Sequence, residues 1–389
     1  MSSVVTQPMY FDTASTTQIA QEVLDEMVAC LSSNGCHGNP SSLMHQPGRA
    51  AAAVVAAARK QMAAELGCEA GEILFTSGAT EANNLAIQGV ALAHAEQGRH
   101  LITSKIEHKS VLETCQALER QGFDVTYLTP NRAGWIELED VKNALRTDTL
   151  LVSLMHTNNE TGIQQPLEAV ADLIANAGVL FHVDASQAAG KFRIDLNSIP
   201  IDLLSISAHK FHGPKGAGCL FIRNRRRLKI QPLVFGGGQE FGLRSGTLAT
   251  HQIVGLSEAM HLAASRRDAD FFHVVELKSF FLERLAMQIK IKIHGDPRCC
   301  SPYLVNISIA GISSDALINQ LLNDVAISSG AACSSGTIDS SYVLRAMGID
   351  GDDLYGAVRI GFSRYHTISD VLKAAQHIVS AVHRMQELD

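Results

Sequence analysis

Short apolar segments alternate with stretches of helical periodicity through the middle of the chain. Between about residues 71 and 223, several apolar segments have the length and composition of buried strands. They lie at residues 73–76, 100–103, 125–128, 150–155, 179–183, 203–206 and 219–222. Intervening stretches have helical spacing, at residues 81–96, 110–121 and 166–177. This alternation predicts an α/β fold, in which helices cover both faces of a mainly parallel sheet.

The flanking regions predict helices and a second, smaller unit. Upstream, residues 21–31 and the alanine-rich residues 49–66 are expected to be helical, and another helix begins near Thr250 and leads out of the large domain. Beyond about Asp268 the pattern predicts an α+β unit, with helical residues 272–289, extended residues 303–309 and a short helix at 315–322. We therefore expect a large domain at residues 13–262. Residues 1–12 and 263–389 would form the small domain.

Composition and charge restrict the class of protein. The 389 residues are 46% hydrophobic and 18% charged, which provides for a large core and excludes a mostly disordered chain. The net charge of −7 opposes nucleic-acid binding through bulk charge, and the basic run at residues 223–229 is better explained as a solvated surface strip. The longest apolar run, residues 50–58, is far shorter than the roughly 20 residues of a membrane-spanning helix. The first dozen residues lack a signal segment, so we expect a cytoplasmic location.

Eight cysteines lack the spacing of a disulfide framework or of a structural zinc site, and no metal is expected. Most are predicted to be buried small hydrophobic residues. Cys333 is the exception, because it lies among Ser, Gly and Ala residues that can bury little surface. We therefore expect a mobile loop at about residues 328–340, in which the Cys333 thiol has a role other than packing.

Two segments at predicted strand ends could bind a ligand. After residues 73–76 the chain turns through small residues, and a helix begins near Thr80, so that free N–H groups converge as a phosphate requires. Taken alone, an ordinary Ser/Thr helix cap explains this segment better. Asp184 ends the strand at 179–183, at the edge where open α/β sheets bind ligands, although a helix N-cap is an equally good explanation.

Lys210 is the third candidate. It follows the strand at 203–206 and has serines, histidines and a Gly-Pro turn around it, which is unlike a solvated surface lysine. A half-buried lysine loses its proton more readily and can react with an aldehyde. The nearby Lys215 has a Gly-Pro-Lys-Gly setting typical of a turn. Together, a helix N-terminus for phosphate, an Asp for a pyridinium nitrogen and a Lys for an aldehyde predict pyridoxal phosphate as the cofactor.

Motifs along nearly the whole chain carry a family resemblance. They are residues 38–41, 76–84, 107–109, 155–162, 182–187, 209–216, 244–247 and 328–333. In their order and spacing they resemble the group I (NifS-like) cysteine desulfurases, which are fold-type I pyridoxal-phosphate enzymes of the class V aminotransferase family. The spacing from Ser328 to residues 342–346 is similar to the long-loop group I pattern and differs from the short-loop group II pattern. The resemblance implies conversion of L-cysteine to L-alanine, with the sulfur passing through an enzyme persulfide to an acceptor protein.

The resemblance also implies roles for individual residues. Cys333 would be the nucleophile that takes the sulfur, Lys210 would bind the cofactor and move the substrate Cα proton, and His108 would stack on the cofactor ring and assist proton transfer. Arg359 and Asn159 would bind the substrate carboxylate. A surface position on a C-terminal strand is the alternative for Arg359, and Arg364 lies close to it in sequence. The cofactor contacts would come from Lys210, Asp184, Gln187, Ala79, Thr80, Ser207, His209, Asn159 and Thr247.

Thr247 would complete the phosphate site of a partner subunit, so the resemblance implies a homodimer.

Three departures from the family pattern stand out. Ser15 occupies a position where alanine is usual, and Phe241 one where many members have a basic residue. The chain also stops at Asp389, without the extended tail with which housekeeping iron–sulfur members contact their scaffold. This favours a dedicated sulfur supplier, for nitrogenase-type clusters or for sulfur modification of tRNA or DNA. Any nucleic acid would be reached through a partner.

Other functions remain open on the same fold. A selenocysteine lyase or another β-elimination lyase needs no persulfide cysteine. An aminotransferase would release a keto acid. A non-catalytic scaffold would keep the fold only for binding partners, but the presence of Lys210, Asp184, His108 and Cys333 together opposes it.

Overall fold

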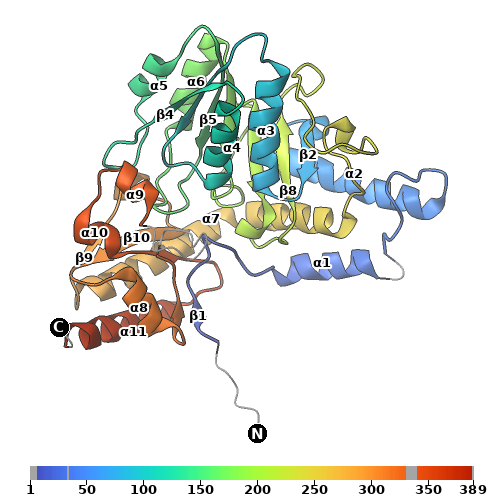
Figure 1. The fold of residues 1–389 in the computed structure, drawn as a ribbon. Coiled ribbons are helices and arrows are strands. Elements are labelled where there is room, and N and C mark those ends of the chain that lie inside the picture. Colours follow the sequence, from blue (N-terminus) through green and yellow to red (C-terminus); the bar gives the residue numbers. More distant parts are fainter. Residues whose placement is uncertain (1–6, 33–34, 330–339, 388–389) are drawn as a thin grey trace.

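The computed structural model describes residues 7–32, 35–329 and 340–387. Its largest feature is a seven-stranded sheet (Figure 1). The spatial order is β2 (Ile73–Thr76), β8 (Gly218–Ile222), β7 (Leu203–Ser207), β6 (Leu180–Asp184), β5 (Thr149–Met155), β3 (His100–Ser104) and β4 (Asp124–Leu128). Neighbouring strands are parallel except at β8, which is antiparallel to both β2 and β7. Every predicted strand is present, with its ends within one residue of the prediction.

Helices cover both faces of this sheet. On one face lie α3 (Ala79–Ala93) and α4 (Lys109–Glu119), and the other face packs against α2 (Gln46–Leu66), α6 (Leu167–Ala177) and the first half of α7. Leu203 and Leu204 are consecutive in β7 and belong to different cores, because alternate side chains of a strand point to opposite faces. The predicted α/β fold class is confirmed. Two further helices, α1 (Gln21–Leu31) and α5 (Leu138–Ala144), complete this part of the molecule.

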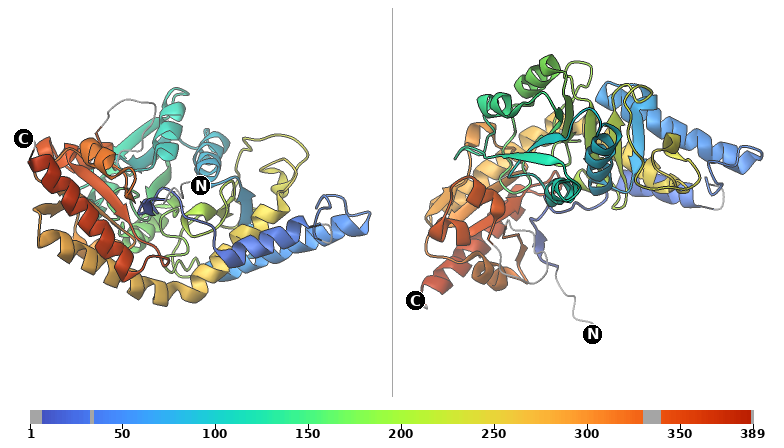
Figure 2. Two further views of the ribbon diagram at one scale, coloured as in Figure 1. Left: turned by 90° about the horizontal axis from the view of Figure 1, so that it is seen from below. Right: turned by 45° about the horizontal axis from the view of Figure 1, so that its top comes forward.

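Helix α7 (Thr250–Ala286) is one continuous helix of 37 residues, where the sequence predicted two. Residues 256–286 contain neither glycine nor proline, so nothing in this stretch breaks the helix. The first half of α7 packs with α1 and α2, and the second half packs with α11 (Ile368–Gln386). Seen from below, the helix curves along the molecule from the projecting α1–α2 arm to the smaller lobe (Figure 2).

The smaller lobe contains a three-stranded antiparallel sheet in the order β12 (Ala357–Gly361), β10 (Leu304–Ile309) and β9 (Ile291–Ile293). Its core also includes residues of α7 and α11 and the N-terminal Phe11. The remaining elements are β1 (Met9–Tyr10), β11 (Val325–Ala326), α8 (Ser314–Leu321), α9 (Tyr342–Ala346) and α10 (Gly351–Tyr355). The division into residues 13–262 and a small domain of residues 1–12 and 263–389 stays a proposal. The change of core along α7 and the place of Phe11 support it.

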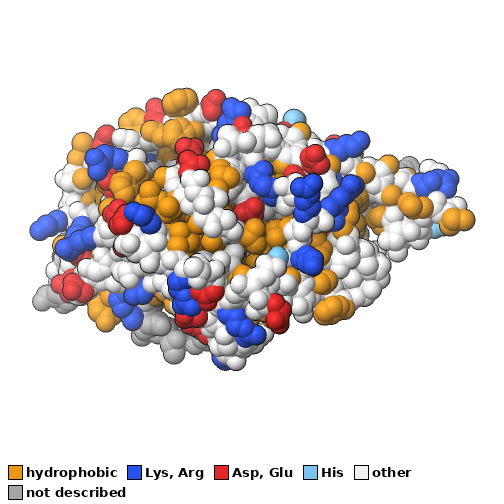
Figure 3. Space-filling model, turned by 90° about the horizontal axis from the view of Figure 1, so that it is seen from above, with side chains coloured by type: hydrophobic (Ala, Val, Ile, Leu, Met, Phe, Trp, Pro, Cys, Tyr) orange, Lys and Arg blue, Asp and Glu red, His pale blue; other side chains and the backbone are white. Residues whose placement is uncertain are grey.

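The charged surface differs in part from the expectation. Acidic and basic side chains are interspersed over the upper face of the molecule (Figure 3). The basic run at 223–229 is not simply a solvated strip, since the Arg223 guanidinium donates to the carbonyl oxygens of Leu196, Ile199 and Ile201. Arg225 Nε also donates to the Gly71 carbonyl oxygen at 2.7 Å. Across the described ranges, no helix is both long and apolar enough to span a membrane.

The cysteines are less buried than predicted. Of the seven in the described residues, Cys30, Cys115 and Cys219 are buried, whereas the other four are partly exposed. All seven are free thiols. Cys333 lies outside the described residues. The four partly exposed cysteines lie in or beside short connecting segments, where a hydrophobic pattern is too short to indicate burial: Cys36, Cys68, Cys299, which ends a short 3-10 helix, and Cys300.

Candidate active site

A cavity of about 430 Å³ lies where the carboxyl ends of β5, β6 and β7 meet the N-terminus of α3. This volume is typical of a small-molecule site. The predicted residues that line it are Ala79, Thr80, His108, Asn159, Asp184, Gln187, Ser207, His209, Lys210 and Arg359. Thr247 is exposed and does not line this cavity. The cavity therefore brings together predicted site residues from six separate segments of the chain.

The N-terminus of α3 forms one end of the cavity. No side chain caps this helix, so the ordinary Ser/Thr cap does not explain the segment, and the first N–H groups at Ala79 and Thr80 remain available. The turn before the helix needs glycine, because Gly78 has a φ of 149° and β8 approaches it closely. A Cβ atom at Gly218 would lie 2.6 Å from the Gly78 Cα atom. The backbone is thus shaped to bind an anionic group such as a phosphate.

Asp184 lies at the end of β6 and is almost completely buried. Its Oδ2 accepts a hydrogen bond from Asn83 Nδ2 at 2.8 Å. Its Oδ1 accepts from the Ser186 backbone N–H at 2.9 Å and from the Ser186 hydroxyl. The contact with the Ser186 N–H belongs to a turn, and no helix begins directly after Asp184 in the described residues, so the helix N-cap explanation is not supported. A carboxylate has about four acceptor positions, so one remains for a protonated ring nitrogen.

Lys210 lies in the turn after β7, with its amine inside the cavity. Its Nζ donates to the carbonyl oxygens of Ala14 at 2.7 Å and Ser15 at 2.8 Å. Burial and the nearby Arg359 charge lower the pKa of Lys210 to about 8, against the opposing effect of two carboxylates. The side chain therefore gives up its proton more readily than an ordinary lysine. Lys215 is exposed at the cavity wall.

His108 caps the N-terminus of α4 and presents its ring to the cavity. The Ser110 backbone N–H donates to Nδ1 at 3.1 Å, so the neutral ring carries its proton on Nε2. Burial of the ring lowers the pKa of His108 below its usual value. His209 lines the same cavity, and burial together with the Lys210 charge lowers its pKa to about 4. Both imidazoles are therefore neutral at neutral pH.

Arg359 points into the cavity from β12 and is only 5% exposed. Its Nη1 donates to the Asn159 carbonyl oxygen at 2.8 Å. Its Nη2 donates to Asp12 Oδ1 at 2.8 Å and to Ser15 Oγ at 2.7 Å, while Nε has no partner in the part of the chain that the structure describes. The side chain is thus a buried guanidinium at the cavity wall, which excludes the surface-charge explanation.

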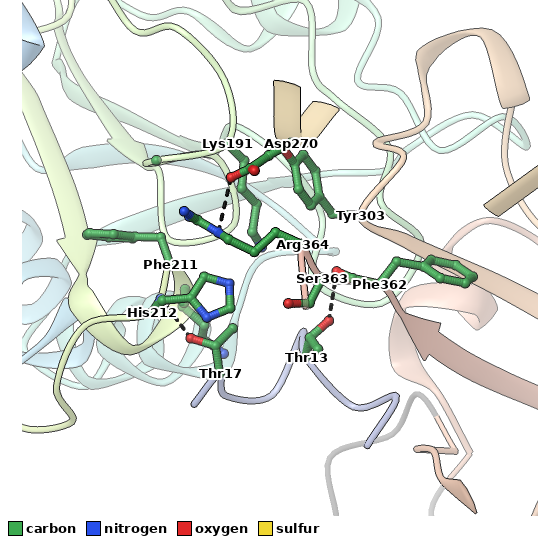
Figure 4. Close-up of a pocket in the computed structure, with 12 residues that line it drawn as sticks. Thr13, Thr17, Lys191, Phe211, His212, Asp270, Tyr303, Phe362, Ser363 and Arg364 are labelled. Carbon is green, nitrogen blue, oxygen red and sulfur yellow. Dashed lines mark hydrogen bonds and ion pairs between the residues drawn. The ribbon is translucent and has the colours of Figure 1, made fainter. Parts of the chain in front are cut away.

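Arg364 is not equivalent to Arg359. Its Nε lies 3.0 Å from Asp270 Oδ2, and both side chains are 8% exposed. Figure 4 shows this pair beside Lys191 and Tyr303, around a separate cavity of about 20 Å³. Arg364 is thus held by Asp270 and does not line the main cavity, so Arg359 is the arginine that faces that cavity.

The donor set fits pyridoxal phosphate. The uncapped N-terminus of α3 suits the phosphate, Asp184 has an acceptor position left for the ring nitrogen, and the Lys210 amine is available for the aldehyde. Within residues 7–32, 35–329 and 340–387, Asn159 Oδ1 is also buried without a hydrogen-bond partner. An unpaired buried acceptor is costly, so this atom is consistent with a ligand that supplies the missing donor.

Several contributing residues were missed from the sequence. Asn83 and Ser186 hold Asp184, and Asp12 pairs with Arg359. Asn83 is fully buried, but in the sequence it stands beside the polar Glu81 and Asn84, so no local pattern distinguishes it. The partner of Asp12 is 347 residues away and no local pattern indicates it.

Phe241, one of the departures from the family pattern, has a structural explanation. Its ring centroid lies 3.6 Å from the Arg225 guanidinium carbon and 5.1 Å from that of Arg59. Arg59 also pairs with the buried Glu240, whose carboxylate accepts from the Phe75 backbone N–H at 2.7 Å. A basic residue in place of Phe241 would add a third positive charge here, whereas an aromatic ring attracts both arginines.

Comparisons with known proteins agree with this site. The aminotransferase class-V family model matches residues 9–373. The cysteine desulfurase IscS of Buchnera aphidicola subsp. Acyrthosiphon pisum (strain 5A) is 44% identical over 381 residues, which cover 98% of this chain and 94% of that protein. A solved NifS-like protein has a TM-score of 0.91 at 35% identity, covering 97% of this chain and all of the other. The structure titled "SspA in complex with cysteine" has a TM-score of 0.82 at 36% identity, with coverages of 92% and 100%.

The fold and the cavity therefore define a pyridoxal-phosphate enzyme, and the chain belongs to the aminotransferase class-V family. Within that family it is a member of the cysteine desulfurases, since its full-length relatives carry that name. The predicted fold type, cofactor and family are confirmed. The roles of the individual residues and of the partner subunit stay predictions.

Proposed function

We propose that this enzyme converts L-cysteine to L-alanine and collects the sulfur as a persulfide on Cys333. The observation that carries the proposal is that Lys210 and Arg359 both contact Ser15. Lys210 Nζ donates to its carbonyl oxygen at 2.8 Å, and Arg359 Nη2 donates to its hydroxyl at 2.7 Å. An amine site and a carboxylate site so close together match the two ends of an α-amino acid.

Bound pyridoxal phosphate supplies an electron sink that weakens the bonds at the substrate Cα and Cβ atoms. Arg359 binds the substrate carboxylate, and the buried guanidinium orients the amino acid. Lys210 moves the Cα proton, because a pKa of about 8 lets its amine accept and return a proton near neutral pH. His108 lies against the same cavity as a neutral imidazole that can donate from Nε2.

Cys333 takes the sulfur. Its thiolate attacks the substrate sulfur, so that an S–S bond forms while the Cβ–S bond breaks. The electron pair of the broken bond stays with the carbon product, which becomes alanine after protonation. The persulfide then passes its outer sulfur to an acceptor protein, for iron–sulfur cluster assembly or for sulfur modification of nucleic acid. Cys333 itself lies outside the described residues.

The proposal includes a cytoplasmic homodimer. Thr247 is exposed and does not line the cavity of its own chain, which supports a role at the phosphate site of a partner subunit. The buried Arg59–Glu240 pair anchors the segment that leads to Thr247. Analytical ultracentrifugation tests the dimer. A Thr247→Ala variant that stays dimeric and loses cofactor affinity would support the shared site, and unchanged affinity would contradict it.

The activity is tested by an absorbance spectrum combined with a single turnover on L-cysteine. Wild-type enzyme should be yellow, release one alanine per active site and carry one extra sulfur on Cys333, detected by mass spectrometry. Cys333→Ala should keep the chromophore and lose the persulfide. Cys299→Ala is the matched control, because Cys299 is a partly exposed free thiol outside the site, and it should behave as wild type.

Other outcomes would replace the proposal. Full turnover by Cys333→Ala would assign a β-elimination lyase, and a keto acid product would assign an aminotransferase. Absence of a chromophore after addition of pyridoxal phosphate would contradict the role of Lys210 and leave a non-catalytic scaffold.

A further inference from the structure

We propose that Ser15 is a specificity-determining residue, whose hydroxyl binds the substrate carboxylate together with Arg359. The inference rests on the proposed role of Arg359 in binding that carboxylate. Ser15 lines the cavity and is exposed to it.

The hydrogen bonds of Arg359 show what a carboxylate would meet. A guanidinium has five N–H donors, two of them on Nη2. Both Nη2 donors are in use, one to Asp12 and one to the Ser15 hydroxyl. Nη1 donates to the Asn159 carbonyl oxygen and has a second N–H, and Nε has no partner among the described residues. A carboxylate that binds this guanidinium would use the free N–H of Nη1 or Nε. Both nitrogens are bonded to the same carbon as Nη2, so the carboxylate would lie close to Asp12 and Ser15.

The two Nη2 acceptors respond to a carboxylate in opposite ways. Asp12 is itself a carboxylate when ionised, so it has no proton to donate and repels a second negative charge. A serine hydroxyl has one donor as well as two acceptor positions. The Ser15 hydroxyl oxygen accepts from Arg359, and its O–H donates to no acceptor within the described residues. The same hydroxyl can therefore accept from Arg359 and donate to the substrate carboxylate, whereas the methyl group of an alanine can do neither.

The backbone of Ser15 adds to this selectivity. Its carbonyl oxygen accepts from Lys210, and its hydroxyl accepts from Arg359, so one residue lies between the amine site and the carboxylate site. The Arg359 side chain is buried, and its contacts with the Asp12 carboxylate and the Asn159 carbonyl oxygen hold it in place even without the serine hydroxyl. Removing the hydroxyl should therefore weaken carboxylate binding without releasing the arginine.

The test is a spectrophotometric titration of the holoenzyme with L-alanine, a product amino acid that keeps the carboxylate and carries no sulfur. Ser15→Ala should raise the dissociation constant about tenfold, the effect of one hydrogen bond to a charged group. Ser15→Thr restores a hydroxyl and should return the value toward wild type. L-alaninamide has a neutral amide in place of the carboxylate, and the substitution should change its binding less than twofold. In turnover, Ser15→Ala should raise KM for L-cysteine with little change in kcat.

The outcomes separate this inference from the proposed function. Equal loss of L-alanine and L-alaninamide affinity in Ser15→Ala, or no loss of either, would overturn the role of Ser15. An Arg359→Lys variant is titrated in parallel. If Arg359→Lys loses L-alanine affinity and Ser15→Ala does not, only the inference about Ser15 fails. If Arg359→Lys binds L-alanine as wild type does, the carboxylate site itself is assigned wrongly.

Discussion

Glu107 is a carboxylic acid in the interior of the protein, and its charge can be tested directly. The side chain is 0% exposed. Its Oε1 accepts a hydrogen bond from Ser104 Oγ at 2.6 Å, and its Oε2 is buried without a hydrogen-bond partner from the described residues. Burial raises the pKa of Glu107 to about 8, and the negative charge of Asp184 adds to this effect. At neutral pH the residue is therefore mostly protonated in the folded protein.

The size of the effect follows from proton linkage. An exposed glutamic acid has a pKa of 4.5, so between pH 4.5 and about 8 the folded protein holds a proton that the unfolded chain releases. The contribution of this group to stability is complete below pH 4.5 and is lost as the pH rises to about 8. Each pH unit of this interval corresponds to about 1.4 kcal/mol, so the whole interval is worth roughly 5 kcal/mol as an upper bound.

The perturbation is Glu107→Gln, which resembles the protonated acid in shape and cannot ionise. The free energy of unfolding in urea should be compared between wild type and variant from pH 5 to 9, with cofactor bound in both. The difference in free energy of unfolding, variant minus wild type, should increase by up to about 1.4 kcal/mol per pH unit and level off above pH 8. Glu113→Gln on the surface of α4 is the control and should show no such trend. Parallel curves for Glu107→Gln and wild type would refute a buried neutral acid.

Three further substitutions test other parts of the structure. In Gly218→Ala the new Cβ atom would lie 2.6 Å from the Gly78 Cα atom, so the strain should cost about 1–3 kcal/mol and lower the affinity for pyridoxal phosphate in a reconstitution titration. Glu240→Ala leaves the Arg59 charge buried without its partner and should lower the free energy of unfolding by about 3–5 kcal/mol, measured in urea. His182 is fully buried between two serine hydroxyls, and burial lowers its pKa to about 4. Below pH 6.5 the unfolded chain therefore binds a proton that the folded protein does not bind until about pH 4. His182→Asn should therefore lose less stability than wild type between pH 6.5 and 4 in the same unfolding assay.

The large sheet could be predicted from the sequence because each strand is a continuous apolar segment between turn signals. The same reasoning divided α7 at about Asp268, where charged residues interrupt the apolar pattern. Charge alone does not end a helix. Without glycine or proline in residues 256–286, the backbone continues while its apolar face passes from one core to the other.

The candidate site could be predicted in its motifs and not in its long-range contacts. Residues such as Asp184 and Lys210 follow predicted strands, so their place at the sheet edge follows from the topology. The pairing of Arg359 with Asp12 and Ser15 depends on how the N-terminal segment crosses to β12, which no local pattern reveals. The arrangement of Phe241 between Arg59 and Arg225 likewise joins three distant segments.

The continuity of α7 has a consequence for how the molecule holds together. When one helix belongs to two hydrophobic cores, each core helps to stabilise the other. Unfolding either half of the helix exposes its apolar face and allows the remaining half to fray. The two lobes are therefore expected to lose their structure in one cooperative event, and a chain cut near residue 268 would leave both fragments with an unprotected helix end. The lobe that carries the pyridoxal-phosphate cavity and the lobe that supplies Arg359 thus depend on each other for stability as well as for the site they form.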